Sequence, residues 1–306
     1  MLKLRALLLI FILFPVLFSC MQNQGNADTP KVLRYGVSTA DEDPANARSR
    51  MQSMKNYLEK ELGIEVKIYE TSGYGSVIEA LRSNKLDISS IGSFTYILAT
   101  TNSNVEAISC RGTIEGLVEP YHSVIITRAG SNIKTMQDVI EHAPEFTLVY
   151  SDPASTSGHL IPRAYLESMG LKNESFKQVF FSGSHSTSFF TVRAGKTDIG
   201  CVSESTINKL TKEGKANKSD FVVLWRSERI INGAICVRKA LPDAFKKKLQ
   251  IAHADFRFKD PENWKLYSQL IAKQTILPYD SLCFIDANDS MFNELRVIAK
   301  RYDLIK

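Results

Sequence analysis

The chain has 306 residues, of which 38 are Lys or Arg and 33 are Asp or Glu, so its formal net charge is +5. Two of the basic residues, Lys3 and Arg5, lie in an N-terminal segment that we expect to be removed, which brings the balance closer to neutral. A near-neutral chain without a basic tract is a poor partner for nucleic acid. The remaining length, with strand-like and helix-like segments in alternation, suits two α/β lobes built from one chain.

Residues 1–19 have the order of a bacterial secretory signal. A basic pair precedes the apolar run 6–18, which is short for a membrane-spanning helix. Leu17-Phe-Ser-Cys20 resembles the lipobox of bacterial lipoproteins, which implies cleavage before Cys20 and a lipid on that residue. Residues 20–30 would then be a flexible tether. We therefore expect a folded body held at the outer side of the inner membrane or in the outer membrane; an uncleaved anchor helix is the alternative.

The rest of the chain repeats one pattern, in which an apolar strand-like run is followed by a small polar turn and an amphipathic helix. The predicted strands are 32–37, 64–69, 86–91, 146–150 and 178–181, and the predicted helices are 49–62, 77–84, 94–101, 160–169 and 187–195. In open α/β sheets, ligands bind at the carboxyl ends of the strands. The polar turns of this chain are therefore expected to face one cleft.

The turn before the helix 160–169 contains three successive hydroxyl residues, Ser155, Thr156 and Ser157. The first turn of a helix leaves N–H groups without partners and carries partial positive charge, so such a turn can hold a small oxyanion. The alternative is that Ser155 or Ser157 is only a helix N-cap, which needs a single hydroxyl. Pro162 fits the first turn of a helix but not its interior, which predicts a late start or a kink.

Catalytic and metal-binding motifs are missing from the sequence. The four cysteines beyond Cys20 lack metal-ligand spacing, so buried free thiols are expected, although an exported chain can pair two of them. These cysteines are Cys110, Cys201, Cys236 and Cys283. The five histidines form no H-E-x-x-H pair, and neither a G-x-S-x-G elbow nor a Walker loop is present. We expect no metal, no cofactor and no enzymatic activity.

Five segments follow one another in a diagnostic order. They are Tyr74 through Leu81 with Asp87, Gly92-Ser-Phe-Thr-Tyr96, Tyr121 through Thr127, Ser155-Thr-Ser-Gly158 with Pro162, and Ser184-His185 with Gly195-Lys-Thr-Asp198. In this order and spacing they resemble the phosphate-, phosphite- and phosphonate-binding proteins of ATP-binding-cassette importers. The match covers roughly residues 32–273.

The resemblance implies the type II periplasmic-binding-protein fold, in which two α/β lobes are joined by a two-crossover hinge and close on a ligand in the cleft. We expect the crossings near residues 121–123 and 222–225. Lobe one would then be 31–120 plus 225–306, and lobe two 121–224. A monomer is expected.

The same resemblance implies the ligand site. Tyr74 and Tyr121 match aromatic hydroxyls that reach the ligand oxygens, and residues 155–157, the hydroxyl triplet, match the group that holds the phosphonate. His185 matches a ligand histidine on the neighbouring turn. The structural alternatives are a surface aromatic for Tyr74, a packed strand residue for Tyr121 and a capping residue for His185. Arg111, Arg128 and Lys196 offer charge, but nothing in the sequence places them in the cleft.

The sequence departs from the family pattern where an amine would be bound. Members that bind aminoalkylphosphonates hold the amine with two carboxylates, and these positions align with Ser205, next to Glu204, and with Gly233. A buried ammonium without a carboxylate is costly. Unless Glu204 turns into the cleft, 2-aminoethylphosphonate is therefore disfavoured, and phosphite, methylphosphonate or phosphate is as plausible. Asp87 and Asp198, at strand starts, are expected to be structural.

The predicted function is that of a lipid-anchored solute-binding protein on the periplasmic or extracellular side of the cell envelope. It would capture a phosphorus oxyanion between its lobes and deliver it to a permease with a cytoplasmic ATPase. An alternative is the same fold used as an extracellular sensor or as a binder of a sulfonate or a thiamine-precursor pyrimidine. An exported phosphoester hydrolase is a weaker alternative.

Overall fold

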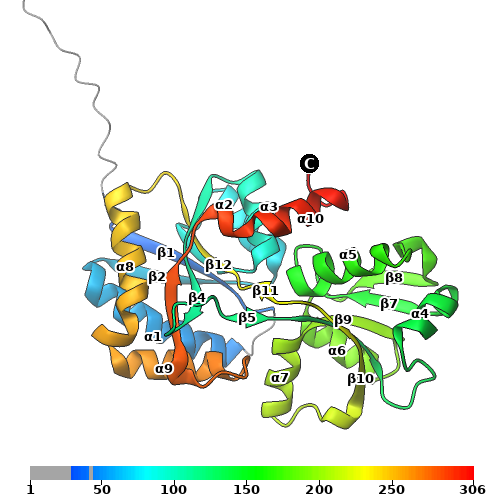
Figure 1. Cartoon of the computed structure of the whole chain (residues 1–306). Helices are drawn as coiled ribbons and strands as arrows, with labels where there is room; N and C mark the ends of the chain where they lie inside the picture. Colours follow the sequence, from blue (N-terminus) through cyan, green and yellow to red (C-terminus); the bar gives the residue numbers. More distant parts are fainter. Residues whose placement is uncertain (1–28, 41–43) are drawn as a thin grey trace, which may run out of the picture.

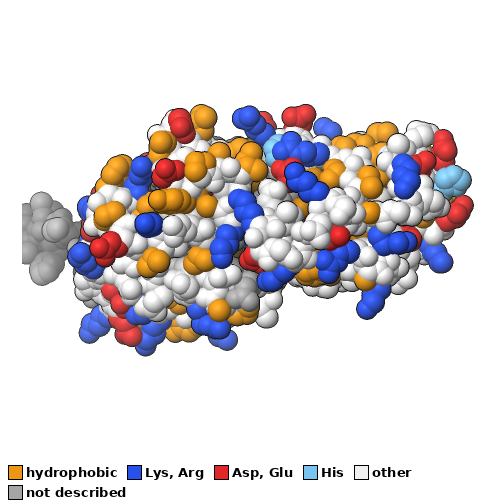
Figure 2. All heavy atoms as spheres, turned by 90° about the horizontal axis from the view of Figure 1, so that it is seen from below, with side chains coloured by type: hydrophobic (Ala, Val, Ile, Leu, Met, Phe, Trp, Pro, Cys, Tyr) orange, Lys and Arg blue, Asp and Glu red, His pale blue; other side chains and the backbone are white. Residues whose placement is uncertain are grey.

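The computed structural model describes residues 29–40 and 44–306 and divides them between two α/β lobes (Figure 1). The predicted signal segment, Cys20 and the tether up to residue 28 lie outside the described residues. Within the described part, no helix has the length and apolar character needed to cross a membrane. Acidic and basic side chains are interspersed over the face shown in Figure 2.

Lobe one is built on a six-stranded sheet with the order β13-β4-β12-β3-β1-β2. Its strands are β1 (Val32–Ser38), β2 (Glu65–Thr71), β3 (Ile88–Ile91), β4 (Val105–Thr113), β12 (Ala234–Arg238) and β13 (Leu282–Asp286). Strand β1 pairs in parallel with β2 and β3, whereas β12 runs antiparallel between β3 and β4. The C-terminal part of the chain thus completes the sheet that the N-terminal part begins.

Helices cover both faces of this sheet (Figure 1). One core contains buried residues of α1 (Pro44–Leu62), α8 (Asp243–Lys259) and α9 (Pro261–Ala272), packed on the β1 residues Leu33, Tyr35 and Val37. The other contains residues of α2 (Tyr74–Arg82), α3 (Ser93–Asn102) and α10 (Asn293–Arg301). Alternate β1 residues share one face because successive strand side chains point to opposite sides.

Lobe two has a five-stranded sheet with the order β10-β6-β9-β7-β8. Its strands are β6 (Ser123–Arg128), β7 (Thr147–Tyr150), β8 (Gln178–Phe181), β9 (Ile199–Ser203) and β10 (Phe221–Arg226). Helices α4 (Met136–His142) and α5 (Ile161–Ser168) pack on one face, and α6 (His185–Arg193) and α7 (Glu204–Lys212) on the other. Asp198 is structural, since its carboxylate accepts hydrogen bonds from the N–H and hydroxyl of Thr147.

Two chain crossings join the lobes. The short strands β5 (Pro120–Tyr121) and β11 (Ile230–Ile231) pair antiparallel between the two large sheets (Figure 1). The outgoing chain passes from β5 into β6, and the returning chain leaves β10 after Arg226. Trp225, which we expected to begin the returning part of lobe one, still pairs with Ile125 in the sheet of lobe two.

The lobes also touch at the start of α3. The backbone N–H of Phe94 donates to Oγ1 of Thr156 at 2.8 Å, and the hydroxyl of Thr95 donates to the carbonyl of Ala154 at 2.9 Å. The first N–H groups of a helix have no partner within the helix. Lobe two therefore supplies a partner that α3 itself lacks.

A second contact between the lobes involves Lys212, at the end of α7. Its Nζ donates to the carbonyls of Ala272 and Thr275, at 2.7 Å and 2.6 Å. Ala272 is the last residue of α9, where a helix carries partial negative charge, and Thr275 follows three residues later. A cation of lobe two thus caps a helix of lobe one.

All four cysteines of the described chain are free thiols. Cys110, Cys201 and Cys236 are buried and Cys283 is half-buried. Burial raises the pKa of the Cys110 and Cys236 thiols to about 12, so both are protonated at neutral pH. The expectation of buried free thiols is confirmed for these residues.

Asp87 ties three strands of lobe one together. Its carboxylate is 1% exposed and lies 2.7 Å from Nη2 of Arg34 in β1 and 2.5 Å from Nη2 of Arg238 in β12. Burial alone would raise the pKa of Asp87, but the hydrogen bonds from Arg34 and Arg238 outweigh it and lower the pKa below its usual range. Asp87 is therefore ionised at neutral pH and stabilises the sheet.

Replacing Asp87 with Asn should lower the free energy of unfolding by about 3 kcal/mol at pH 7, because two partly buried guanidinium groups lose their counter-ion. Because the pKa of Asp87 is lower in the folded than in the unfolded state, its carboxylate stabilises the fold at pH values above the unfolded pKa. This stabilisation is lost as the pH falls through the pKa of the folded state. The difference between wild type and variant should shrink below about pH 4. Urea unfolding across this pH range, with the exposed Asp286→Asn as control, tests this; equal stability at pH 7 would contradict it.

Candidate ligand-binding site

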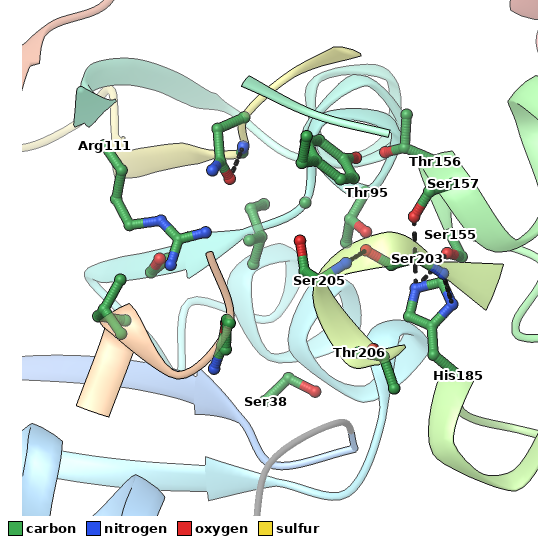
Figure 3. A pocket seen from close by; sticks show the side chains of 18 of the residues that line it. Ser38, Thr95, Arg111, Ser155, Thr156, Ser157, His185, Ser203, Ser205 and Thr206 are labelled. Carbon is green, nitrogen blue, oxygen red and sulfur yellow. Dashed lines mark hydrogen bonds between the residues drawn. The ribbon is translucent and has the colours of Figure 1, made fainter. Parts of the chain in front are cut away.

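A cavity of about 240 Å³ lies between the lobes and is lined by both (Figure 3). Its walls include the carboxyl end of β3 with Gly92, the hinge residue Tyr121, the hydroxyl triplet after β7, and His185 after β8. The prediction that the strand-to-helix turns face one cleft is confirmed. Helices α3, α6 and α7 all begin at this wall, and each adds partial positive charge there.

The hydroxyl triplet sits on a widened helical turn, η2 (Thr156–Leu160). The N–H of Leu160 donates to the carbonyl of Ser155, five residues earlier, at 3.1 Å. Wide turns of this kind are frequent at functional sites. Helix α5 starts only at Ile161, with Pro162 in its first turn, so the predicted late start is confirmed.

Ser155 caps this turn and also lines the cavity. Its Oγ accepts a hydrogen bond from the N–H of Gly158 at 3.0 Å, as an N-cap does. All three members of the triplet are buried and line the cavity. Ser155 is therefore an N-cap and also a cavity-lining residue, rather than an N-cap only.

Tyr121 brings a phenol hydroxyl from the hinge to the triplet. Burial raises the pKa of Tyr121 above its usual value, and the neighbouring hydroxyls of Thr156, Ser157 and Ser93 act in the opposite direction. The net shift is upward, so the phenol keeps its proton at neutral pH and can donate. Oγ1 of Thr156 accepts the N–H of Phe94, which leaves its own hydrogen available for another acceptor.

His185 points its ring at the triplet (Figure 3). Nε2 lies 3.2 Å from Oγ of Ser155 and 3.5 Å from Oγ of Ser157. The backbone N–H of Ser203 donates to Nδ1 at 3.1 Å. Because that N–H can only donate, Nδ1 is an acceptor, and the neutral ring carries its hydrogen on Nε2, facing the cavity. The cap of α6 is Ser184, so His185 is not the capping residue.

Gly158 allows this close packing. A Cβ at that position would lie 2.5 Å from Oγ of Ser151 and 2.7 Å from Cε1 of His185. Real Cβ atoms do not approach other atoms so closely, and any side chain at Gly158 would push the ring away from the triplet.

The amine-binding positions of aminoalkylphosphonate binders hold no carboxylate here. Ser205 lines the cavity, but Glu204 does not: its carboxylate forms a bidentate ion pair with Arg226 of β10, at 2.7 Å and 2.9 Å. We expected Glu204 among the ligand-binding residues, but its carboxylate faces Arg226 and not the cavity. At Gly233, a Cβ would lie 2.1 Å from the carbonyl oxygen of Ile91, so this position accepts no side chain.

Tyr74 lines the cavity from the start of α2. The structure adds three cations that sequence reasoning did not place there, Arg50, Arg111 and Lys209. Arg50 and Lys209 belong to helices in which charged residues are common, so nothing in the sequence indicated that these two face the cavity. Arg128 and Lys196, the other two cations considered, do not line the cavity. Among the described residues, no group of three or more His, Cys, Asp or Glu side chains could hold a metal ion.

Comparison with known proteins identifies the family. The family described as "ABC transporter, phosphonate, periplasmic substrate-binding protein" matches residues 37–281. A phosphonates-binding periplasmic protein of Escherichia coli is 26% identical over 220 residues, which are 72% of this chain and 64% of that protein. The phosphate-import protein PhnD of Mycolicibacterium smegmatis is 25% identical over 223 residues, 70% of this chain and 68% of that protein.

Solved structures share the fold. A binding protein component of an ABC phosphonate transporter from Pseudomonas aeruginosa has a TM-score of 0.76 and 23% identity, with 90% of this chain and 88% of that chain covered. PhnD1 from Prochlorococcus marinus in complex with methylphosphonate has a TM-score of 0.77 and 20% identity, with 90% and 100% covered. The two-lobed periplasmic-binding-protein fold is thus confirmed, and the chain belongs to the family of periplasmic substrate-binding proteins of phosphonate ABC transporters.

Proposed function

We propose that this chain captures a small phosphorus oxyanion that carries no amine and delivers it, as a monomer, to a membrane permease driven by an ATPase. The observation that carries the proposal is the convergence of the hydroxyl triplet, Tyr121 and His185 on one interlobe cavity. The names of two relatives, a phosphonates-binding protein and a phosphate-import protein, support the same ligand class.

Hydrogen bonds from uncharged groups bind the oxyanion. Hydroxyls of Ser155, Thr156 and Ser157, the phenol of Tyr121 and Nε2–H of His185 surround one point of the cavity wall. Hydrogen bonds to an ionised acceptor are about twice as strong as neutral ones, and closure of the cleft strengthens them by excluding water. The anion therefore needs no cationic side chain in direct contact.

An ammonium group would find no carboxylate among the cavity-lining residues that the structure describes. Among the described lining residues there is no acidic side chain, because Glu204 faces Arg226 and Gly233 has no room for a side chain. A buried ammonium without a carboxylate is costly. We therefore infer that 2-aminoethylphosphonate is excluded and that phosphite, phosphate or methylphosphonate is accepted.

The double variant Ser155→Ala/Thr156→Ala should weaken binding of phosphite, phosphate or methylphosphonate by more than a hundredfold. Each lost charge-assisted hydrogen bond is worth roughly 1.5 to 3 kcal/mol. Wild type should show a ligand-dependent rise in melting temperature with at least one of these anions and none with 2-aminoethylphosphonate, sulfate or thiamine.

The control for this experiment is Ser168→Ala, which removes an exposed hydroxyl of the same lobe. Its melting shift should equal that of wild type. Unchanged binding by the double variant would show that the ligand sits elsewhere. A wild-type response to sulfate or thiamine alone would reassign the ligand class.

Ligand binding and lobe closure are coupled through the contacts that only the closed arrangement makes. A ligand shifts the lobes toward closure by as much as it prefers the closed state. We infer that the bonds from Lys212 to the end of α9 and the bond between Phe94 and Thr156 belong to that state, because each of them joins the two lobes. They add to the apparent affinity without touching the ligand.

Lys212→Met should therefore raise the Kd for the bound oxyanion by about two- to tenfold, the equivalent of a modest hydrogen-bond contribution. Methionine keeps the length of the side chain and removes its donors. Isothermal titration of the variant against wild type measures the effect. Lys218→Met, an exposed position in the same lobe, should leave the Kd unchanged; a Kd unaffected by Lys212→Met would mean that this contact does not favour closure.

We further propose that residues 1–19 are removed and that Cys20 carries the lipid that holds the protein at the membrane. The support is the order of basic residues, apolar run and Leu17-Phe-Ser-Cys20. After expression in a bacterium, wild type should fractionate with membranes and Cys20→Ser should not. The control Cys283→Ser should behave as wild type, and a membrane-bound Cys20→Ser protein would refute the lipid anchor.

A further inference from the structure

The cavity has a second end, opposite the hydroxyl triplet. In Figure 3, Arg111 extends into the cavity from one side, and the hydroxyl triplet with His185 lies on the other, with Ser205 between them. The cavity volume of about 240 Å³ exceeds what an ion of the size of phosphate needs, since a water-sized occupant takes only about 10 to 15 Å³ of such volume. A ligand held by the triplet has room for a substituent that reaches toward Arg111.

The buried carboxylate of Glu119 positions the guanidinium of Arg111. Its Nε lies 3.0 Å from Oε2 of Glu119, which is 2% exposed and also accepts a hydrogen bond from the side-chain amide of Asn232 at 3.0 Å. The two terminal amino groups of Arg111 have no hydrogen-bond partner among the described residues. Glu119 thus fixes the guanidinium through one edge and leaves its fork free at the cavity.

The chemistry of this end selects an anion. A guanidinium fork presents parallel N–H groups that match the two oxygens of a carboxylate. The other charged side chains of the described cavity wall, Arg50 and Lys209, are cations as well. A distal ammonium would be repelled here, and a distal methyl group would leave the fork of Arg111 without an acceptor.

We propose that the ligand is a phosphonocarboxylate, a phosphonate whose carbon substituent ends in a carboxylate, and that Arg111 binds this carboxylate. Phosphonoacetate and 3-phosphonopropionate are the simplest representatives. The inference rests on the proposed function, because it takes the oxyanion to lie at the hydroxyl triplet. Arg111 then determines specificity among phosphonates, and the triplet provides the affinity common to all of them.

Isothermal titration with methylphosphonate, phosphonoacetate and 3-phosphonopropionate tests the proposal. Wild type should bind at least one phosphonocarboxylate about tenfold or more tightly than methylphosphonate. The double variant Arg111→Gln/Glu119→Gln should lose about ten- to a hundredfold in affinity for that compound and stay within about threefold of wild type for methylphosphonate. Replacing both residues avoids a buried carboxylate without a counter-ion.

Two further variants keep the test decisive. Arg111→Lys retains the positive charge beside Glu119, so this variant should fold. Because lysine lacks the guanidinium fork, the variant should prefer the phosphonocarboxylate over methylphosphonate by a smaller factor than wild type does. Arg82→Gln removes an exposed arginine of α2 and should change neither affinity. Melting temperatures without ligand establish that each variant is folded.

Equal losses for methylphosphonate and the phosphonocarboxylate would overturn the proposal, since Arg111 would then contact the shared oxyanion. Methylphosphonate bound as tightly as both phosphonocarboxylates by wild type would also overturn it and leave the proposed function intact. Failure of every phosphorus compound to bind wild type would instead refute the proposed function, and this inference with it.

Discussion

The first N–H groups of a helix need acceptors, and at α3 of this protein one acceptor comes from the other lobe. Thr156 accepts the N–H of Phe94, and Thr95 in turn donates to the carbonyl of Ala154. The same turn that supplies Thr156 also presents Ser155 and Ser157 to the cavity. The hydrogen bonds that complete the first turn of α3 therefore bring the two walls of the site together. The geometry of the cleft depends on these two bonds.

The ligand class follows as much from side chains that are excluded as from those that are present. Gly158 lets the ring of His185 approach the triplet, and Gly233 brings the backbone of the returning crossover against Ile91. Glu204 is adjacent in sequence to a lining residue but is turned out by Arg226. What remains in the described wall is a set of neutral donors at one end and cations at the other, with no acidic group to receive a cation.

Strands β1, β2, β3, β7 and β8 and the hydroxyl turn could be predicted from the sequence because their signals are local. A run of apolar residues, a turn of small polar residues and a helical repeat lie within about thirty residues of one another. Pro162 indicated a late start or a kink in the helix that follows the hydroxyl turn, and the structure shows the late start. The placements of Glu204 and Arg111 could not be predicted. Each depends on a partner contributed by a neighbouring strand or crossing, Arg226 for the first and Glu119 for the second. The returning crossing, expected near residues 222–225, begins later for a related reason: Trp225 and Arg226 are held by pairing with β6 rather than by any local pattern.

The order of strands in lobe one also bears on how the protein acquires its structure. Strand β12, from the C-terminal third of the chain, lies between β3 and β4, and all of lobe two is inserted between β4 and β12 in sequence. A chain that emerges from its N-terminus can complete the sheet of lobe two first, whereas the sheet of lobe one stays open at its centre until Arg238 has followed. Contacts of such long sequence separation slow folding. The sheet that contributes Arg111 and one wall of the cleft can thus close only after β12 has followed lobe two, and the cleft cannot enclose a ligand before then.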